Sequence, residues 1–381
     1  DLWAKRANGT EDHHDLTRDI NEVTDITFFA LNGSDRMSVF VGELNPGVDV
    51  SQVHLDMLGG NGDDTFLNAK NAGINSQVYG GSGADVMTGG MGFDVFYGEG
   101  GADVLTGYEG TDLLSGGANN DTYVFGDSHN YYLGLDSVSD TSGIDTLDFS
   151  NWYRGVTVDL AVPGQQIASA GLFLQLGNSV IENVIGTANN DVLLGNSASN
   201  TLVGGVGFDR LEGRGANDLL QGGSGKDTYV FSGTQLGTDS IYDSDSFSDV
   251  ADFRGFGQAV SVDLAKVGSS GYAVDNANLR IRLLNSGAVA EVYGTNYGDT
   301  LLGDSYSNWL HGGGGNDTVD GKGGRDWLYG DAGVDRLTVD SLDYVYGGLG
   351  NDYFNGIRER NIFGQLLSNP APSRYLDWGV V

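Results

Sequence analysis

The stretch from Gly80 to Val124 reads GGSGADVMT GGMGFDVFY GEGGADVLT GYEGTDLLS GGANNDTYV, and each block of nine approximates the pattern Gly-Gly-x-Gly-x-Asp-x-apolar-x. A nine-residue repeat of this kind predicts half a coil of a right-handed parallel β-roll, in which six residues turn and three form a short strand. Two blocks complete one coil, so aspartates 18 residues apart are expected to stack. The sequence therefore predicts an all-β solenoid.

Stacked carboxylates would repel each other unless a cation lies between successive turns. Calcium suits such turns because it takes six to eight hard oxygen ligands in flexible geometry, and the turns offer carboxylates and backbone carbonyls. The glycines permit the positive φ angles and the close backbone approach that turn carbonyls toward an ion. The apolar eighth position points into a narrow interior, so bound metal is expected to supply much of the stability.

The pattern returns in a second run from Gly186 to Val230 and in a third run that starts at Gly294. An isolated copy, GGNGDDTFL, begins at Gly59. The three runs begin 106 and 108 residues apart, which predicts a longer super-repeat above the nonapeptide. The third run is interrupted by an eight-residue unit without glycine, Val339 to Tyr346, so its last turns are not expected to form regular sites.

The sixth position of the units supplies the candidate calcium ligands. They are Asp64, Asp85, Asp94, Asp103, Asp112, Asp121, Asp191, Asn200, Asp209, Asp218, Asp227, Asp299, Asn308, Asp317, Asp326, Asp335 and Asp352. Pairing positions 18 residues apart within the runs predicts about nine or more Ca²⁺ ions. Asn200 and Asn308 stand where the pattern has aspartate, and they still offer a neutral oxygen. Arg214 and Lys322 replace the second glycine and are expected to weaken the sites beside them.

The composition agrees with a calcium-binding array. Of 381 residues 63 are glycine, without the three-residue period of collagen, and the 52 acids divide into 43 Asp and 9 Glu. Asp is the residue of turns and calcium sites, whereas Glu would solvate a surface equally well. The net charge of −33 argues against nucleic acid or an anionic membrane surface as a partner. Cysteine is absent, which excludes a disulfide framework, and no apolar run is long enough to predict a membrane span.

The chain divides into seven predicted segments. They are an N-terminal β-rich segment (1–58), the first roll (59–125), a β-rich insert (126–185), the second roll (186–231), a second β-rich insert (232–293), the third roll (294–356) and a C-terminal tail that is a cap or an export signal (357–381). The inserts correspond to each other, since GVTVDL at Gly155 and AVSVDL at Ala259 occupy equivalent places. Their alternating apolar residues predict strands that continue or buttress the roll.

The nonapeptides resemble the hemolysin-type calcium-binding (RTX) repeats of Gram-negative exoproteins, through a motif that recurs in register from about Gly59 to Asn355. DTLDFS (Asp145 to Ser150), followed by VIENVIGTANNDVLLGNSASN (Val180 to Asn200), resembles the C-terminal β-roll region of serralysin-type secreted metalloproteases. The resemblance implies a calcium-loaded parallel β-roll, export by a type I system and folding outside the cell. It does not imply proteolysis.

The sequence lacks catalytic signatures. His-Glu-x-x-His and Gly-x-Ser-x-Gly do not occur, and the histidines are scattered. His13 and His14 are interpreted as solvated side chains, with a weak metal site as the alternative. One group of aromatic residues is expected to pack over the open end of the roll, the alternative being a sugar-binding platform: Tyr131, Tyr132, Trp152 and Tyr153.

Two function classes remain open. In the favoured class the chain is an extracellular structural or adhesive protein, such as a surface-layer, matrix or filament component, with a second copy or a cell-surface polysaccharide as its candidate partner. In the other class it is the calcium-dependent export and folding module of an exoenzyme or toxin whose catalytic part lies outside this sequence. Only about 58 residues precede the first repeat, too few for a protease or lipase domain, so the chain itself is expected not to be an enzyme.

Overall fold

The structure is a computed structural model that describes residues 25–30, 32–39, 53–68, 73–126, 134–177, 181–243, 249–268, 271–355, 357–358 and 374–375. His13, His14, Tyr131, Tyr132 and most of the predicted C-terminal tail lie outside these residues. The described chain is built from strands and turns, and none of it forms a helix with the length and apolarity needed to cross a bilayer. Two compact units are present, Asp1–Ala188 and Asn189–Val381.

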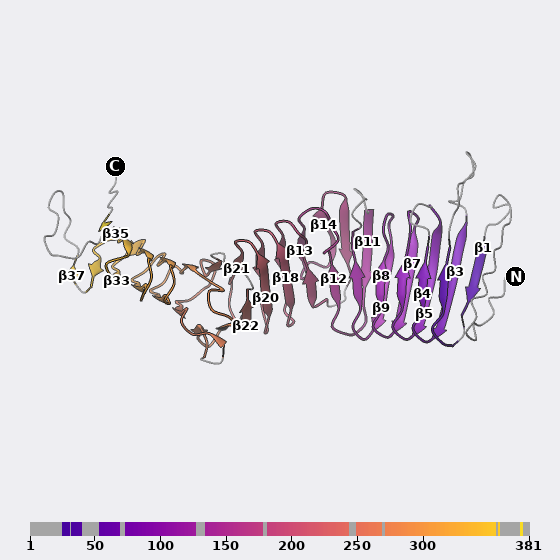
Figure 1. Ribbon diagram of the computed structural model, residues 1–381, viewed down its shortest axis with the longest axis horizontal. Coiled ribbons are helices and arrows are strands. Elements are labelled where there is room, and N and C mark those ends of the chain that lie inside the picture. Colours follow the sequence, from indigo (N-terminus) through magenta and orange to yellow (C-terminus); the bar gives the residue numbers. More distant parts are fainter. Residues whose placement is uncertain are drawn as a thin grey trace. The chain divides into compact units, whose positions relative to one another are not determined.

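The first unit contains two columns of parallel strands (Figure 1). One column consists of β1 (Asp25–Phe29), β3 (His54–Asn61), β5 (Asn75–Ser82), β7 (Asp94–Gly100), β9 (Leu113–Ala118), β11 (Gly134–Ser139) and β15 (Leu172–Leu176). The other consists of β2 (Arg36–Ser38), β4 (Thr65–Leu67), β6 (Val86–Thr88), β8 (Val104–Thr106), β10 (Thr122–Val124), β12 (Thr146–Asp148) and β16 (Asn183–Ile185). The chain alternates between the columns, so each pair of strands forms one coil.

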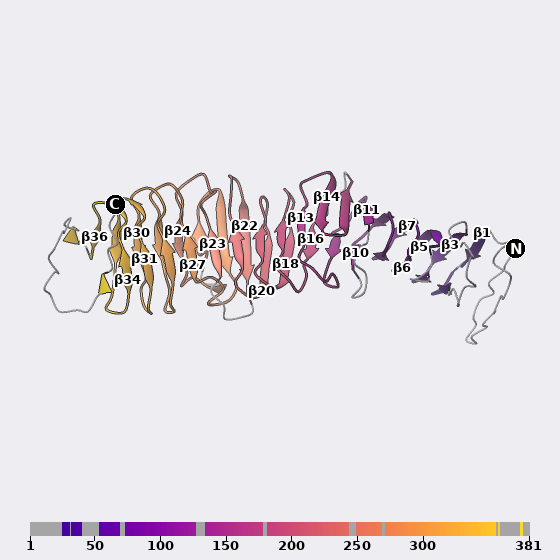
Figure 2. The same ribbon diagram turned by 90° about the horizontal axis from the view of Figure 1, so that it is seen from above.

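The second unit repeats this arrangement (Figure 2). One column consists of β17 (Val192–Leu194), β19 (Arg210–Glu212), β21 (Thr228–Val230), β23 (Val250–Asp252), β27 (Glu291–Tyr293), β29 (Trp309–His311), β31 (Trp327–Tyr329), β34 (Tyr344–Tyr346) and β38 (Arg374–Tyr375). Opposite it lie β18 (Thr201–Val206), β20 (Leu219–Ser224), β22 (Gly237–Tyr242) and β26 (Leu279–Leu283). A further parallel set consists of β24 (Ser261–Asp263), β28 (Thr300–Leu302), β30 (Thr318–Asp320), β33 (Arg336–Thr338) and β36 (Tyr353–Phe354).

The strand register confirms the 18-residue coil inside the repeat runs. Val86 pairs with Val104 in the first run, and Arg210 pairs with Thr228 in the second. Apolar eighth-position side chains stack in the interior and are fully buried, as Leu105 and Leu211 illustrate. Stacking parallel strands in this way satisfies backbone hydrogen bonds between coils while leaving an interior only one side chain deep on each side.

The inserts continue the roll, as their alternating pattern predicts. In the first unit β11, β12, β15 and β16 extend both columns, while β14 (Gly164–Ser169) adds an antiparallel hairpin to β15; β13 (Thr157–Asp159) precedes it. In the second unit β25 (Val274–Asp275) pairs antiparallel with both β24 and β26. Stacked phenylalanines accompany the two inserts, with ring centroids 4.9 Å apart for Phe125 and Phe149 and 5.1 Å apart for Phe231 and Phe253. Trp152 is buried beside Tyr153, which is packing rather than an exposed sugar platform.

The eight-residue unit Val339–Tyr346 does not disturb the columns. Trp327 pairs with Tyr344 and Arg336 pairs with Tyr353, each across 17 residues instead of 18. Short strands β32 (Ala332–Gly333) and β35 (Leu349–Gly350) pair in the turns beside it, and β37 (Ile357–Arg358) pairs antiparallel with β36. The missing residue is therefore absorbed in a turn, and the irregularity expected of the last coils is not seen in their strand pairing.

Candidate calcium sites

Acidic residues form ladders along the edges of both units. In an aspartate ladder, as we use the term, the backbone N–H of one residue donates to the side-chain oxygen Oδ1 (Oε2 for Glu182) of the equivalent residue in the next coil, at 2.7 to 3.2 Å. The first unit contains the ladders Asp35, Asp64, Asp85, Asp103, Asp121, Asp145, Glu182 and Ser76, Asp94, Asp112, Asp136. The second unit contains Asp191, Asp209, Asp227, Asp249; Asn200, Asp218, Asp239; Asp299, Asp317, Asp335, Asp352; and Asn308, Asp326, Asp343.

The second carboxylate oxygen of most ladder residues is buried and available to a ligand. Among the described residues, no hydrogen-bond partner reaches Oδ2 of Asp64, Asp85, Asp103, Asp112, Asp121, Asp145, Asp209, Asp218, Asp317, Asp326, Asp335 or Asp352. These side chains are at most 3% exposed. Native proteins contain few buried polar atoms without a partner, so a row of such oxygens indicates cation binding.

Four predicted ligands near the start of a ladder have a side-chain oxygen that already accepts a local hydrogen bond. The second side-chain oxygen of Asp94 accepts the N–H of Gly90 at 2.9 Å, and Oδ2 of Asp299 accepts the N–H of Thr295 at 2.6 Å. The Oδ1 atoms of Asn200 and Asn308 each accept a turn N–H of their own unit, from Asn196 at 2.8 Å and from Asp304 at 2.9 Å. A local N–H therefore caps the oxygen that is open elsewhere in the ladders.

In most units the first glycine forms a cradle around the open oxygen. A Cβ on Gly98 would collide with Oδ2 of Asp103 and would lie 2.5 Å from the carbonyl oxygen of Gly116 in the next coil. Only glycine leaves this space to a ligand. A carboxylate oxygen and backbone carbonyl oxygens that converge on one point fit calcium, because calcium prefers hard oxygen ligands. In the loaded protein the ladder carboxylates and these carbonyls would hold the ion, and its charge would offset their mutual repulsion.

A family model described as the RTX calcium-binding nonapeptide repeat (4 copies) matches seven segments of the chain, which overlap within three separate groups. They are 75–96, 88–123, 176–211, 194–229, 293–328, 317–341 and 339–356. These segments are RTX calcium-binding repeats. A search of curated proteins found no match to the chain. RTX repeats bind Ca²⁺, and the cradle of Gly98 and Asp103 lies in a matched segment.

Burial changes the protonation of the RTX carboxyls in the metal-free fold. It raises the pKa of Asp103 and Asp335 to about 6 and that of Asp209 and Asp317 to about 7, above their ordinary value. A carboxyl whose pKa is raised by folding stabilises the fold fully only below its unfolded pKa, and this contribution is lost as the pH rises through the folded pKa. At neutral pH the ionised carboxylates therefore destabilise the metal-free coils. A bound cation would offset this destabilisation.

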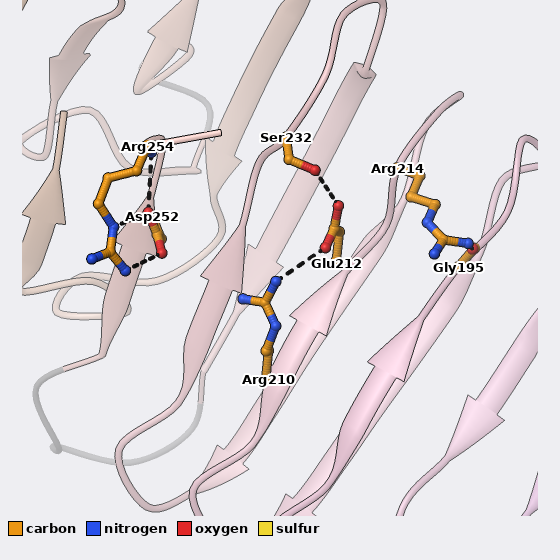
Figure 3. A network of polar contacts seen from close by, with 7 residues as sticks. All are labelled: Gly195, Arg210, Glu212, Arg214, Ser232, Asp252 and Arg254. Carbon is orange, nitrogen blue, oxygen red and sulfur yellow. Dashed lines mark hydrogen bonds and ion pairs between the residues drawn. The ribbon is translucent and has the colours of Figure 1, made fainter. Parts of the chain in front are cut away.

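Arginine side chains of the RTX roll form ion pairs with acids that do not belong to the ladders. Figure 3 shows Arg254 bonded to Asp252 at 2.6 Å and Arg210 bonded to Glu212 at 3.2 Å, with Ser232 also donating to Glu212. Burial alone would raise the pKa of Asp252, but the hydrogen bonds from Arg254 outweigh it and lower the pKa. The charges of Asp252 and Glu212 are therefore compensated by arginines of the protein itself, in contrast to those of the ladder carboxylates.

Arg214 and Lys322 keep the turn conformation of the glycines that they replace, with φ of 72° and 63°. The Arg214 guanidinium donates to the carbonyl oxygen of Gly195 at 2.7 Å, as Figure 3 shows. The Lys322 ammonium pairs with Asp263 at 2.5 Å. Arg214 thus occupies a turn carbonyl with its own charge, which is the physical basis for the weaker calcium binding that we predict there.

The nonapeptide pattern does not identify several ladder residues, because they do not follow the preceding ladder residue by 18 positions. Asp145 follows Asp121 by 24 residues and Asp239 follows Asp218 by 21. A shorter signal would have found them, because each is followed two residues later by an apolar residue of the interior, as in Asp145-Thr-Leu147. The other residues missed in this way are Asp35, Asp136, Glu182, Asp249 and Asp343.

Two glycines of one RTX turn provide a test of the cradle. A Cβ on Gly321 would lie 2.7 Å from Cγ of Asp326 and would collide with its Oδ2, so we expect Gly321→Ala to raise the calcium midpoint of folding about tenfold or more. Two residues later, a Cβ on Gly323 would meet no heavy atom of the described residues within 4 Å. Gly323→Ala is the matched control, and its midpoint should change less than about twofold. Similar midpoints for the two variants, measured by circular dichroism, would contradict the cradle.

Proposed function

We propose that the chain is an extracellular structural or adhesive protein whose β-roll folds when calcium binds outside the cell. The observation that carries the proposal is the row of buried Oδ2 atoms beside glycine cradles in all three runs. RTX repeats bind calcium, and proteins that carry them are typically exported by type I systems. The proposal places the function in the array itself.

The distribution of residues supports a structural rather than a catalytic role. In the described chain the buried acids belong mainly to ladders that repeat from coil to coil. An ion pair between Lys226, in the turn before β21, and Glu291 of β27 links coils that are separated by strand β23. Each such feature stabilises stacking and none is confined to one distinctive cleft. A second copy of the chain or a cell-surface polysaccharide remains the proposed partner.

The affinity of the repeat sites tests where folding takes place. Sites made of backbone carbonyls and few carboxylates belong with extracellular modules, so we expect dissociation constants on the order of 0.1 to 1 mM for most ions. The protein would then stay unfolded at the calcium concentration of the cytosol and fold completely outside the cell. Isothermal titration calorimetry with Ca²⁺, and with Mg²⁺ as the control cation, measures this directly. Nanomolar binding at every site would be incompatible with folding after export.

A further inference from the structure

Three carboxylates converge where the first repeat run meets its insert. One oxygen from each of Asp121, Asp140 and Asp145 lies within 4.8 Å of the others. We propose that these three residues form a calcium site of a second type, which binds more tightly than the repeat sites and fastens the insert to the first run. This proposal rests on the proposed calcium-dependent folding, but it adds two residues outside the nonapeptide pattern, Asp140 and Asp145, to the repeat ligand Asp121.

The buried oxygens of the cluster point to a ligand. Asp121 and Asp145 are each 1% exposed, and their Oδ2 atoms have no hydrogen-bond partner among the described residues. Their Oδ1 atoms already accept the ladder N–H groups of Asp103 and Asp121. Two oxygens bound to one Ca²⁺ are at most about 5 Å apart, because each lies roughly 2.3 to 2.6 Å from the ion. The observed separation meets this requirement.

The side chain of Asp140 is held in place by its neighbours. The N–H groups of Thr141 and Ser142 donate to Oδ1 at 2.6 and 3.1 Å. The hydroxyl of Tyr123 donates to Oδ2 at 2.5 Å and itself accepts the N–H of Gly116 at 2.7 Å. Tyr123 is the fully buried eighth-position residue of the last unit in the run, so the interior of the roll positions this ligand. Such preorganisation lowers the cost of ordering the site when the ion binds.

The cluster differs from a repeat cradle at one sequence position. Asp140 lies five residues before Asp145, where the repeat pattern places its first glycine. A repeat cradle leaves that place open and surrounds the ion with backbone carbonyls, whereas here a third carboxylate fills it. Calcium affinity rises with the number of charged ligands and with the rigidity of the site. This cluster should therefore release its ion more slowly than the repeat cradles.

The second unit contains the same arrangement at the end of its first repeat run. Oxygens of Asp227, Asp243 and Asp249 lie within 4.8 Å of one another, and all three residues are buried. Tyr229 donates to Oδ2 of Asp243 at 2.9 Å and accepts the N–H of Gly222 at 3.0 Å. A tyrosine that holds an insert aspartate beside the last repeat aspartate thus occurs twice, which argues against a chance cluster.

Calcium release from the folded chain tests the proposal. The calcium-loaded protein is mixed rapidly with an excess of a fluorescent calcium chelator, and the ions released in each kinetic phase are counted. We expect the slowest phase to contain about two ions per chain. Asp140→Asn should remove about one of them, and the double variant Asp140→Asn/Asp243→Asn should remove the phase. Asp148→Asn, in the neighbouring strand β12, is the matched control and should leave the phase unchanged.

A slow phase that persists in the double variant would overturn the proposal, and so would its absence from the parent protein while repeat ions are released. Failure to bind any calcium would instead refute the proposed function. If Asp140→Asn does not fold by circular dichroism, Tyr123→Phe replaces it, because this change keeps all three carboxylates and removes only the hydroxyl. We expect it to accelerate the release of one slow ion about tenfold, since a hydrogen bond to a charged group is lost. An unchanged rate would also overturn the proposal.

Discussion

Excess chelator should convert the protein from β structure to coil, and added calcium should restore it. The interior is only a few apolar residues wide in each coil, and ladder carboxylates face each other along every edge. Without a cation this repulsion adds to the conformational entropy that folding must overcome, so metal-binding free energy becomes folding free energy. Far-ultraviolet circular dichroism during a calcium titration measures the transition.

Magnesium is the matched control for this experiment. It demands octahedral geometry and keeps several of its waters, so it should restore little β structure at the same concentration. A β spectrum that is unchanged in excess chelator would show that the stacked carboxylates tolerate each other without metal. Restoration by any divalent cation alike would attribute the effect to charge screening rather than to built sites.

Asp103→Ala should raise the calcium midpoint of folding about tenfold or more, the largest effect expected of a single ladder residue. Asp103 stands between Asp85 and Asp121 in its ladder, and its Oδ2 faces the cradle of Gly98. Loss of this carboxylate should weaken the ions on both sides, and in a stacked array each coil is stabilised mainly by its neighbours. The midpoint is measured by circular dichroism at fixed protein concentration.

Two further variants make the comparison decisive. Asp148 lies on β12 of the first insert and accepts the N–H of Ser150 at 2.8 Å, so Asp148→Ala should shift the midpoint about twofold or less. Asp352 ends its ladder, so the midpoint shift of Asp352→Ala should lie between those of Asp103→Ala and Asp148→Ala. If the ladder carboxylates do not bind calcium, Asp103→Ala removes an uncompensated buried charge and should stabilise the fold. The sign of the effect therefore separates the two explanations.

The fold is predictable from the sequence because the turn residues and the interior residues recur together every nine positions. The nonapeptide determines both the strand position and the side that faces inward, so the spacing alone places Met87, Leu105 and Tyr123 in the interior, where they are buried. Pairing across the inserts is harder to predict. Asp136 follows Asp112 by 24 residues and Asp239 follows Asp218 by 21, so the 18-residue spacing cannot reveal that these residues share a ladder.

The candidate sites are only partly predictable for a related reason. The pattern identifies the sixth-position residues but not the state of their second oxygen, which depends on neighbouring turns. Asp94 and Asp299 match the repeat, yet a turn N–H caps each of them. Asp140 matches no position that the repeat assigns to a ligand, and its role emerges only from the approach of Tyr123. Contacts between coils, rather than residue identity, distinguish these cases.

The short unit at Val339–Tyr346 bears on how such a chain can change in evolution. Its strands stay in register with both neighbouring coils although one residue is missing, because a turn accommodates the difference. Single-residue insertions and deletions are therefore tolerated at the edges and opposed in the strands. Duplication of whole coils adds length without altering any existing interior contact except at the junction. Gene segments of one or more coils can thus be gained or lost as units, which makes the length of the array an evolutionarily adjustable dimension.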